Sequence, residues 1–325
     1  MPVLLSARAI VRPPVPLLTA GEARALRIDV SSREYARVRP GIHASSAGVS
    51  RLAPWERYAL RVHAFELACP GATMCLESAA VLHGLPSFGE CRDIHVFAAH
   101  RSASRRFGDV SVHTSVDPRE VVEIAGVRVT SLLDTVVDLA RALPPAQALA
   151  VLDAATSPAQ GGAVTRDEVR HRATQRADQR GARQLAWVLD TADPLAESPG
   201  ESVSRAVILW SGFEVPLLQQ DFHYEGVHDR VDFLFPSNGA IGESDGWGKY
   251  DLADPEAAKR HLTNEKRRED RLRRNRHPFG RWDYAGAVRV GPLTEALESA
   301  QVRRVGAPDR ARLATLQRTP RSRGR

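Results

Sequence analysis

A strand–turn–strand pattern at residues 229–250 is the strongest constraint on the fold of this 325-residue chain. Apolar side chains at every second position predict a strand with one buried face, and here they are Val231, Phe233 and Phe235. Residues 237–239, Ser-Asn-Gly, predict a turn, and residues 240–244 predict a second short strand that runs back. The pattern therefore predicts a hairpin whose two strands are neighbours in a sheet.

The hairpin carries three carboxylates, and a lysine follows it. Asp232 lies on the non-core side of the first strand, whereas Glu243 and Asp245 share one face of the second, because side chains alternate along a strand. Clustered carboxylates repel one another unless a cation lies among them, and oxygen ligands favour Mg²⁺ or Mn²⁺. With Lys249 available to polarise water or stabilise an oxyanion, the cluster predicts phosphodiester hydrolysis. The alternative is an exposed hairpin with solvated acids.

The run from Asp232 to Lys249 resembles the D…E-x-D-G motif of nucleases in the PD-(D/E)XK superfamily. The closest likeness is to the branch similar to very-short-patch-repair endonucleases, and it covers roughly residues 198–285. The resemblance implies that Asp232 and Glu243 hold the metal, with Asp245 assisting. The superfamily's lysine normally stands two residues after the second acid, where this chain has Asp245. Lys249 is the nearest replacement, which leaves the identity of the water-activating group open.

The residues around the hairpin predict the rest of that domain. A helix begins at residues 198–201 and runs to about Trp210, and the order helix–strand–strand–strand–helix–strand is the one that the resemblance implies. Glu201 resembles the helix-borne acid that supports the metal in this superfamily. The alternative is a capping box, in which Glu201 satisfies backbone donors at the start of the helix. Gln219 or Gln220 on the next strand is within reach of the acids.

Positive charge is concentrated towards the end of the chain. Residues 259–325 carry 19 Lys and Arg against 7 Asp and Glu, which leaves the rest of the chain net negative. Beside the acids, a charged helix at 259–276 predicts a surface for DNA phosphates, formed by Lys266, Arg267, Arg268 and Arg271. The alternative is a solvated helix face.

Two stretches in the first half resemble one family. Residues 37–44, RVRPGIHA, resemble the turn and wing of the winged-helix head of abortive-infection antitoxins of type IV toxin–antitoxin systems. Helices at 20–28 and through Val38 are expected in this head. Residues 74–156 resemble the region that accompanies such heads, which is frequently fused to a repair-type nuclease domain. The resemblance implies DNA reading by the head and admits a toxin-like protein partner; the alternative is a head that only packs on the next domain.

Two further residue pairs have metal-ligand chemistry. His95 and His113 lie on predicted strands and are expected on the solvent face of a sheet, where no third ligand is evident. Asp134 and Asp138 lie four residues apart on one face of a predicted helix. For both pairs a polar, solvated face is the favoured interpretation.

Composition limits the class of protein further. Hydrophobic residues at 43% and charged residues at 26% are ordinary for a globular protein. The three cysteines, Cys69, Cys75 and Cys91, form no C-x-x-C pair, which argues for a reducing compartment and against zinc. The sequence shows neither a secretory signal nor an apolar run long enough for a membrane span, so we expect a cytoplasmic protein without membrane contact.

These patterns predict an α/β (α+β) protein that acts on DNA as a Mg²⁺- or Mn²⁺-dependent endonuclease, in repair, phage defence or mobile-element biology. The alternative is a non-catalytic DNA-binding regulator or antitoxin of a type IV toxin–antitoxin-like system. The sequence leaves the oligomeric state open. The predicted domains are a small helical, winged-helix-like head (1–48), a mixed α/β antitoxin-like region (49–157), a helical connector (158–197), a restriction-endonuclease-like domain with a central mixed sheet flanked by helices (198–290) and a basic, partly disordered tail (291–325).

Overall fold

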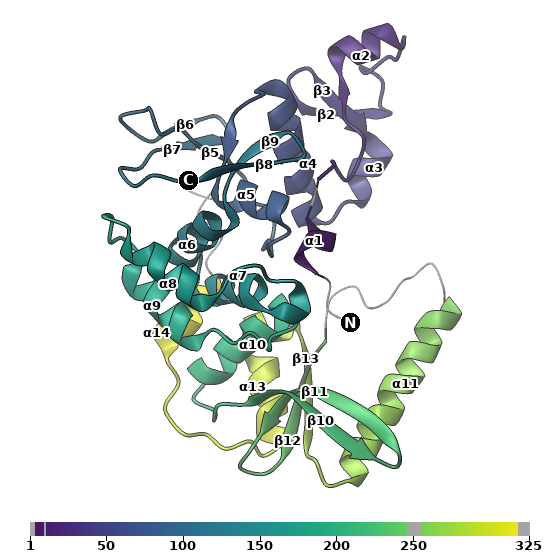
Figure 1. Cartoon of the computed structure of the whole chain (residues 1–325). Coiled ribbons are helices and arrows are strands. Elements are labelled where there is room, and N and C mark those ends of the chain that lie inside the picture. The colour runs from purple at the N-terminus through teal and green to yellow at the C-terminus, as the bar shows by residue number, and fades with distance from the viewer. Residues whose placement is uncertain (1–3, 10, 246–254, 318–325) are drawn as a thin grey trace.

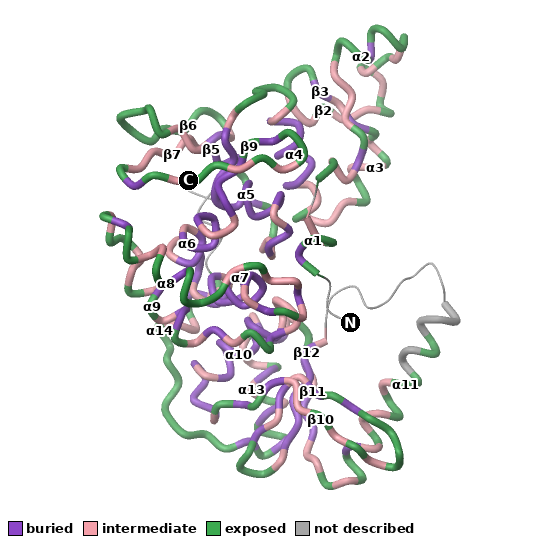
Figure 2. The backbone as a smooth tube through the Cα atoms, in the orientation of Figure 1, coloured by how far each residue is buried: buried purple, intermediate pink, exposed green. Residues whose placement is uncertain are grey.

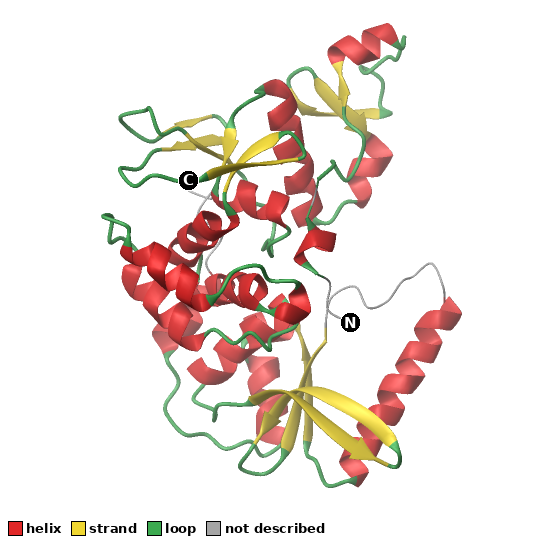
Figure 3. Ribbon diagram, in the orientation of Figure 1, coloured by secondary structure: helices red, strands yellow, loops and turns green. Residues whose placement is uncertain are grey.

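The computed structural model describes residues 4–9, 11–245 and 255–317. It is an α/β structure in which helices are combined with a three-stranded, a six-stranded and a four-stranded sheet (Figure 3). Along the chain, the three-stranded sheet belongs to the head, the six-stranded sheet to the middle region and the four-stranded sheet to the C-terminal region. A layer of helices lies between the last two sheets (Figure 1).

The head is built around the small sheet, whose strand order is β1-β3-β2. Apolar side chains around Val15, Ala44 and Leu60 close its core. Its elements, with the helix that precedes them, are α1 (Leu5–Arg8), β1 (Leu18–Thr19), α2 (Ala20–Ala25), β2 (Tyr35–Arg39), β3 (Ile42–Ser45) and α3 (Ser46–Arg51).

The helix expected through Val38 is wrong, because these residues form strand β2. Residues 40–41, Pro-Gly, make the turn to β3, and Gly41 adopts a φ of 75°, a left-handed conformation that suits glycine. Pairing with β3 satisfies the backbone of β2, and Val38 packs against the head core. The turn that the sequence predicts therefore forms a hairpin instead of ending a helix.

The middle region carries the six-stranded mixed sheet, in the order β6-β7-β5-β4-β9-β8. Two helices, α4 (Pro54–Ala68) and α5 (Leu76–His83), supply apolar side chains to its core, among them Tyr58 and Leu82. The strands are β4 (Thr73–Met74), β5 (Ile94–Phe97), β6 (Arg105–Phe107), β7 (Val110–His113), β8 (Val121–Ile124) and β9 (Val127–Thr130).

The helical layer shares one apolar core that reaches from α5 to the start of the C-terminal region. Figure 2 shows its backbone as largely buried around α6, α7 and α10. The members of this layer are α6 (Leu132–Ala142), α7 (Pro145–Thr156), η1 (Pro158–Gln160), α8 (Arg166–Thr174), α9 (Ala182–Thr191) and α10 (Pro199–Trp210).

The C-terminal sheet has the order β10-β11-β12-β13, with antiparallel pairs except for the parallel pair β12/β13. Helices α10, α12 and α13 cover one face, and Leu272 of α11 packs on the other. After α10 the elements are β10 (Leu217–Tyr224), β11 (Val227–Phe235), β12 (Ala240–Asp245), α11 (Pro255–Arg274), β13 (Phe279–Asp283), α12 (Tyr284–Arg289), α13 (Gly291–Ser299), α14 (Arg310–Leu313) and η2 (Ala314–Gln317). The predicted order helix–strand–strand–strand–helix–strand is confirmed.

Within the basic tail that we expect to be partly disordered, residues 291–317 are ordered and include α13, α14 and η2. Leu293 and Leu297 of α13 are buried against the C-terminal sheet. Their spacing of four residues puts both on one helix face. Residues 318–325 lie outside the described part of the chain.

A buried ion pair joins the helical layer to the C-terminal region. The Nη2 of Arg205 on α10 donates to Oδ2 of Asp153 on α7 at 2.6 Å, and the backbone N–H of Asp193 donates to Oδ1 at 2.9 Å. Burial raises the pKa of Asp153, while the guanidinium of Arg205 acts in the opposite direction. The pair therefore ties α10 to α7 inside their shared core.

We expect Arg205→Met to lower the free energy of unfolding by about 3–5 kcal/mol, because a buried carboxylate loses its cation. Urea unfolding measures the change. The control Arg170→Gln, which breaks an exposed ion pair with Asp167, should cost less than about 1 kcal/mol. The double variant Asp153→Leu/Arg205→Met should be more stable than Arg205→Met alone, and equal losses would contradict this role.

Candidate active site

Three carboxylates from three different elements lie near one another where β11 and β12 stop pairing. Glu201 lies in the first turn of α10, where the Ser198 side chain caps the helix by accepting from the Glu201 N–H at 3.2 Å. Asp232 lies on β11 and Glu243 on β12, one residue beyond the paired residues Phe233 and Gly242. The charge of Asp232 acts on both glutamates, so the three side chains share one electrostatic site.

Asp232 is held between the two strands of the hairpin. Its Oδ2 accepts the backbone N–H of Ser244 at 2.9 Å, just past the last pair of the β11/β12 ladder. A side-chain oxygen thus takes the place of a backbone acceptor where the two strands separate. This bond orients the carboxylate of Asp232 towards the strand that carries Glu243.

Glu201 is 7% exposed and accepts two hydrogen bonds through Oε2, from the Glu197 N–H and from Gln219 Nε2, each at 2.9 Å. Ser198 caps the helix, but Glu201 accepts from the N–H of Glu197, one residue before the cap, so the reciprocal capping box that the sequence offers as the alternative does not form. Gln219 has a left-handed φ of 52°, an unusual conformation for a residue with a side chain. The predicted reach of Gln219 to the acids is confirmed.

Glu243 is 5% exposed and is bound by an arginine of α11. The guanidinium of Arg268 contacts both carboxylate oxygens, with Nη2–Oε1 at 2.6 Å and Nη1–Oε2 at 3.2 Å. Arg268 Nη2 also donates to the carbonyl oxygen of Arg230 at 2.5 Å. The arginine therefore acts as an internal counterion for the acid cluster and attaches α11 to it.

Burial dominates the titration of this site. It raises the pKa of Glu201 and of Glu243 to about 8, and the charge of Asp232 adds to the effect in both. Arg268 acts in the opposite direction on Glu243. Glu201 and Glu243 therefore resist ionisation at neutral pH unless a cation enters.

The remaining predicted residues lie around this cluster. Asp245 is half exposed at the end of β12, and its Oδ1 lies 3.5 Å from Nη1 of Arg281. Arg271 is engaged in a two-pronged ion pair with Asp229, with both N–O distances at 2.7 Å. Lys266 and Arg267 are exposed on α11. Lys249 lies outside the described residues, so its role stays a prediction.

Potential metal ligands come together most tightly elsewhere. In the described part of the chain, one group of three His, Cys, Asp or Glu side chains places its ligand atoms within 4.8 Å of one another, namely Glu77, Cys91 and His95. The acids of the C-terminal sheet are spaced more widely, with Arg268 bound to one of them. The tight group is in the middle region, where the sequence predicts solvated histidines.

The expectation for His95 is wrong, because its side chain is 2% exposed. Its Nδ1 lies 2.9 Å from Nε2 of His113, which is partly buried. Strand β5 lies inside the six-stranded sheet, between β4 and β7, and both of its faces are covered. Alternation along a strand separates two faces but does not reveal that neighbouring elements bury both of them.

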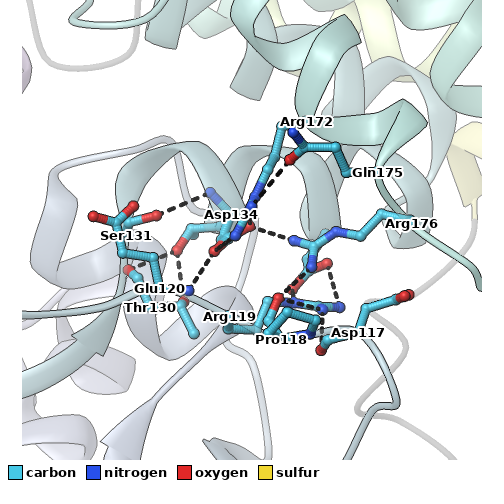
Figure 4. Close-up of polar contacts among 12 residues, drawn as sticks. Asp117, Pro118, Arg119, Glu120, Thr130, Ser131, Asp134, Arg172, Gln175 and Arg176 are labelled. Atoms are coloured by element: carbon cyan, nitrogen blue, oxygen red, sulfur yellow. Dashed lines mark hydrogen bonds and ion pairs between the residues drawn. The ribbon is translucent and has the colours of Figure 1, made fainter.

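The solvated face expected for Asp134 and Asp138 is also wrong. Asp134 is 0% exposed and receives two hydrogen bonds from Arg172 of α8, at 2.7 and 2.8 Å, and a further one from Arg176 (Figure 4). Asp138 is bound by both Nε and Nη2 of Arg119, at 2.7 and 2.9 Å. Arginines distant in sequence thus convert a polar face of α6 into a buried ion-pair network.

Comparison with known proteins gives a limited context. The chain matches no protein-family model and no solved structure. It is 32% identical over 166 residues to two uncharacterized proteins of Mycobacterium tuberculosis, from strains CDC 1551 / Oshkosh and ATCC 25618 / H37Rv. The matched region is 51% of this chain and 59% of each relative, so the chain spans less than two thirds of their length.

Among the helices that the structure describes, none is long and apolar enough to cross a bilayer.

Replacing Glu201 by Gln tests the buried acid. In the folded protein the pKa of Glu201 is about 8, above the ordinary value of 4.5. The folded state therefore binds the proton more tightly than the unfolded state does. The stability that this contributes is fully present below pH 4.5 and is lost as the pH rises through 8. In EDTA, we therefore expect Glu201→Gln to raise the Tm by about 2 °C or more at pH 8.5, and to leave it almost unchanged at pH 4.5.

Differential scanning fluorimetry across this pH range gives the measurement. The matched control is Glu123→Gln on β8, an exposed glutamate, which should change the Tm little at either pH. A Glu201→Gln effect of the same size at both pH values would show that the acid is not held neutral by burial.

Proposed function

We propose that the C-terminal region is a metal-dependent endonuclease domain that hydrolyses phosphodiester bonds in DNA. The observation that supports this most is the group of buried carboxylates from α10, β11 and β12, two of which have pKa values raised by burial and by their shared neighbour Asp232. Buried acids that disfavour their own ionisation are suited to a site completed by a cation. The resemblance of these segments to the PD-(D/E)XK superfamily points to the same chemistry.

The donor set fits Mg²⁺ or Mn²⁺, because it offers carboxylate oxygens alone. In this proposal Asp232 and Glu243 would hold the ion, with Glu201 and Asp245 assisting. When bound, such an ion lowers the pKa of water and neutralises charge on the phosphate. Lys249 would orient the attacking water or offset developing charge.

Arg268 gives the site an exchangeable counterion. Its guanidinium pairs with both oxygens of Glu243, and the same two-pronged geometry suits two oxygens of a phosphate. A cation among the acids would release the arginine from Glu243, and a DNA phosphate would then accept its N–H groups. Arg268 would so couple occupation of the acid cluster to substrate binding.

The same helix, α11, also provides a surface for neighbouring phosphates of the DNA strand. Lys266 and Arg267 are exposed on the same helix, one and two residues before Arg268, and point to other sides of the helix than Arg268 does. Arg271 is committed to the buried Asp229 and serves mainly to fix α11 on the sheet. Charge at the first two positions would attract the phosphate backbone without reading sequence.

A second function is favoured by the ion pair itself. With Arg268 neutralising Glu243, the acid cluster can be stable without any cation, as in a DNA-binding regulator that has lost catalysis. In such a protein the basic helix and the antitoxin-like head would bind DNA, and no metal would be needed.

Repair, phage defence and mobile-element biology are the settings in which the proposed nuclease function would act.

Purified full-length protein should nick supercoiled plasmid DNA in Mg²⁺ or Mn²⁺ and not in EDTA. Asp232→Asn should reduce nicking to the EDTA level, because it removes the charge at the centre of the cluster. Asp221→Asn is the matched control, since Asp221 is an exposed acid of the same sheet that pairs with His228, and it should leave nicking unchanged. Equal nicking by Asp232→Asn and wild type would identify contamination and not a nuclease.

DNA binding provides a separate test, in EDTA and at several salt concentrations. The double variant Lys266→Gln/Arg267→Gln should weaken binding to all duplex sequences, and lower the slope of log affinity against log salt by about two, because two phosphate contacts are lost. Arg289→Gln on α12, an exposed arginine beyond the opposite face of the sheet, is the control. Tight binding in EDTA without nicking in Mg²⁺ would favour the regulator.

A further inference from the structure

A cluster of soft and borderline donors lies in the core of the middle region, remote in sequence from the acids of the C-terminal sheet. Glu77 lies in the first turn of α5, Cys91 precedes β5 and His95 lies on β5. Cys91 Sγ is 3.6 Å from His95 Nε2, and Glu77 Oε2 is 3.4 Å from the same nitrogen. All three ligand atoms lie within 4.8 Å of one another.

These separations match the edges of a zinc coordination tetrahedron. Zinc bonds of about 2.0–2.3 Å at the tetrahedral angle place a sulfur and a nitrogen ligand about 3.6 Å apart, and a nitrogen and an oxygen ligand about 3.4 Å apart. Both distances measured at His95 Nε2 have these values. Two of the three donor–donor separations thus match a zinc tetrahedron, and the third lies within 4.8 Å.

Surrounding residues hold the donors in this arrangement. His95 Nδ1 is hydrogen-bonded to Nε2 of His113 at 2.9 Å, which leaves Nε2 of His95 directed at the other two donors. The backbone N–H of His95 donates to Ser78 Oγ at 2.9 Å, and Ser78 Oγ is 2.8 Å from the hydroxyl of Tyr58. Metal-ligating histidines are generally oriented by such a bond on the second ring nitrogen.

A small cavity opens beside two of the donors. Its volume is about 20 Å³, and its lining includes Glu77, Cys91, Tyr58 and the apolar side chains of Phe88 and Leu139. This volume is enough for about one water molecule.

We propose that Glu77, Cys91 and His95 bind one zinc ion, with the fourth position directed to a water molecule in this cavity. The mixed sulfur, nitrogen and oxygen donors select a borderline metal such as Zn²⁺ over Mg²⁺. The site is therefore chemically distinct from the carboxylate cluster of the C-terminal sheet and independent of its function. Bound zinc would fasten the segment before β5 to α5 and to the sheet.

The test uses full-length protein that has been stripped with a chelator and titrated with Co²⁺ as a spectroscopic substitute for zinc. We expect one thiolate-ligated Co²⁺ per chain, counted from the thiolate-to-cobalt charge-transfer band, which Zn²⁺ then displaces. Cys91→Ser should abolish the band, and His113→Gln should keep the band at saturation while weakening metal affinity by about 10–100-fold. Cys69→Ser, at an exposed cysteine, and Asp232→Asn should leave band and affinity unchanged.

Folded wild-type protein without a charge-transfer band would overturn the proposal, as would a band that survives Cys91→Ser. Circular dichroism reports whether the variants fold. If Cys91→Ser does not fold, the charge-transfer band is compared between the wild type and Cys69→Ser. The comparison is informative because the band requires a thiolate ligand. A band in both supports the buried site, and its loss in Cys69→Ser refutes it.

Discussion

The ion pair between Arg205 and Asp153 fixes the helix on which the C-terminal region depends. It lies inside the core shared by α7 and α10, where two unpaired charges would be costly. The same helix covers one face of the four-stranded sheet and presents Glu201 to the acids of β11 and β12. The position of one carboxylate of the candidate site is thus determined by a contact with the helical layer, outside the sheet that carries the other two.

Buried charge and its compensation recur through the molecule. Asp134 is neutralised by Arg172 and Arg176, and Glu243 by Arg268, each through short, direct hydrogen bonds. The difference between the two lies in access to alternative partners. Asp134 is enclosed between α6 and α8, whereas Arg268 lies on a helix whose adjacent residues are exposed. In the proposed function, the second pair would exchange its cation for a metal ion and its carboxylate for a phosphate.

Local patterns predicted the C-terminal region well, because its elements follow one another in sequence. The hairpin, its turn and the order of elements from α10 to β13 were predicted from residues a few positions apart, and so was the reach of Gln219 or Gln220 towards the acids. Predictions failed where segments remote in sequence decide the conformation of a residue or the burial of its side chain. Strand β2 takes its conformation from pairing with β3. His95 and Asp134 are buried by elements that no local period reveals.

The sequence alone determined the α/β class, the helices with strong apolar stripes and the adjacency of Asp232 and Glu243, because period and turn chemistry are local properties of the chain. The tertiary structure decided which charged groups meet. It brought Arg268 to Glu243, 25 residues away, and brought Glu77, Cys91 and His95 together without any paired-cysteine spacing. Such meetings depend on the packing of whole elements, since hydrophobic burial selects the arrangement and the polar side chains must find their partners within it.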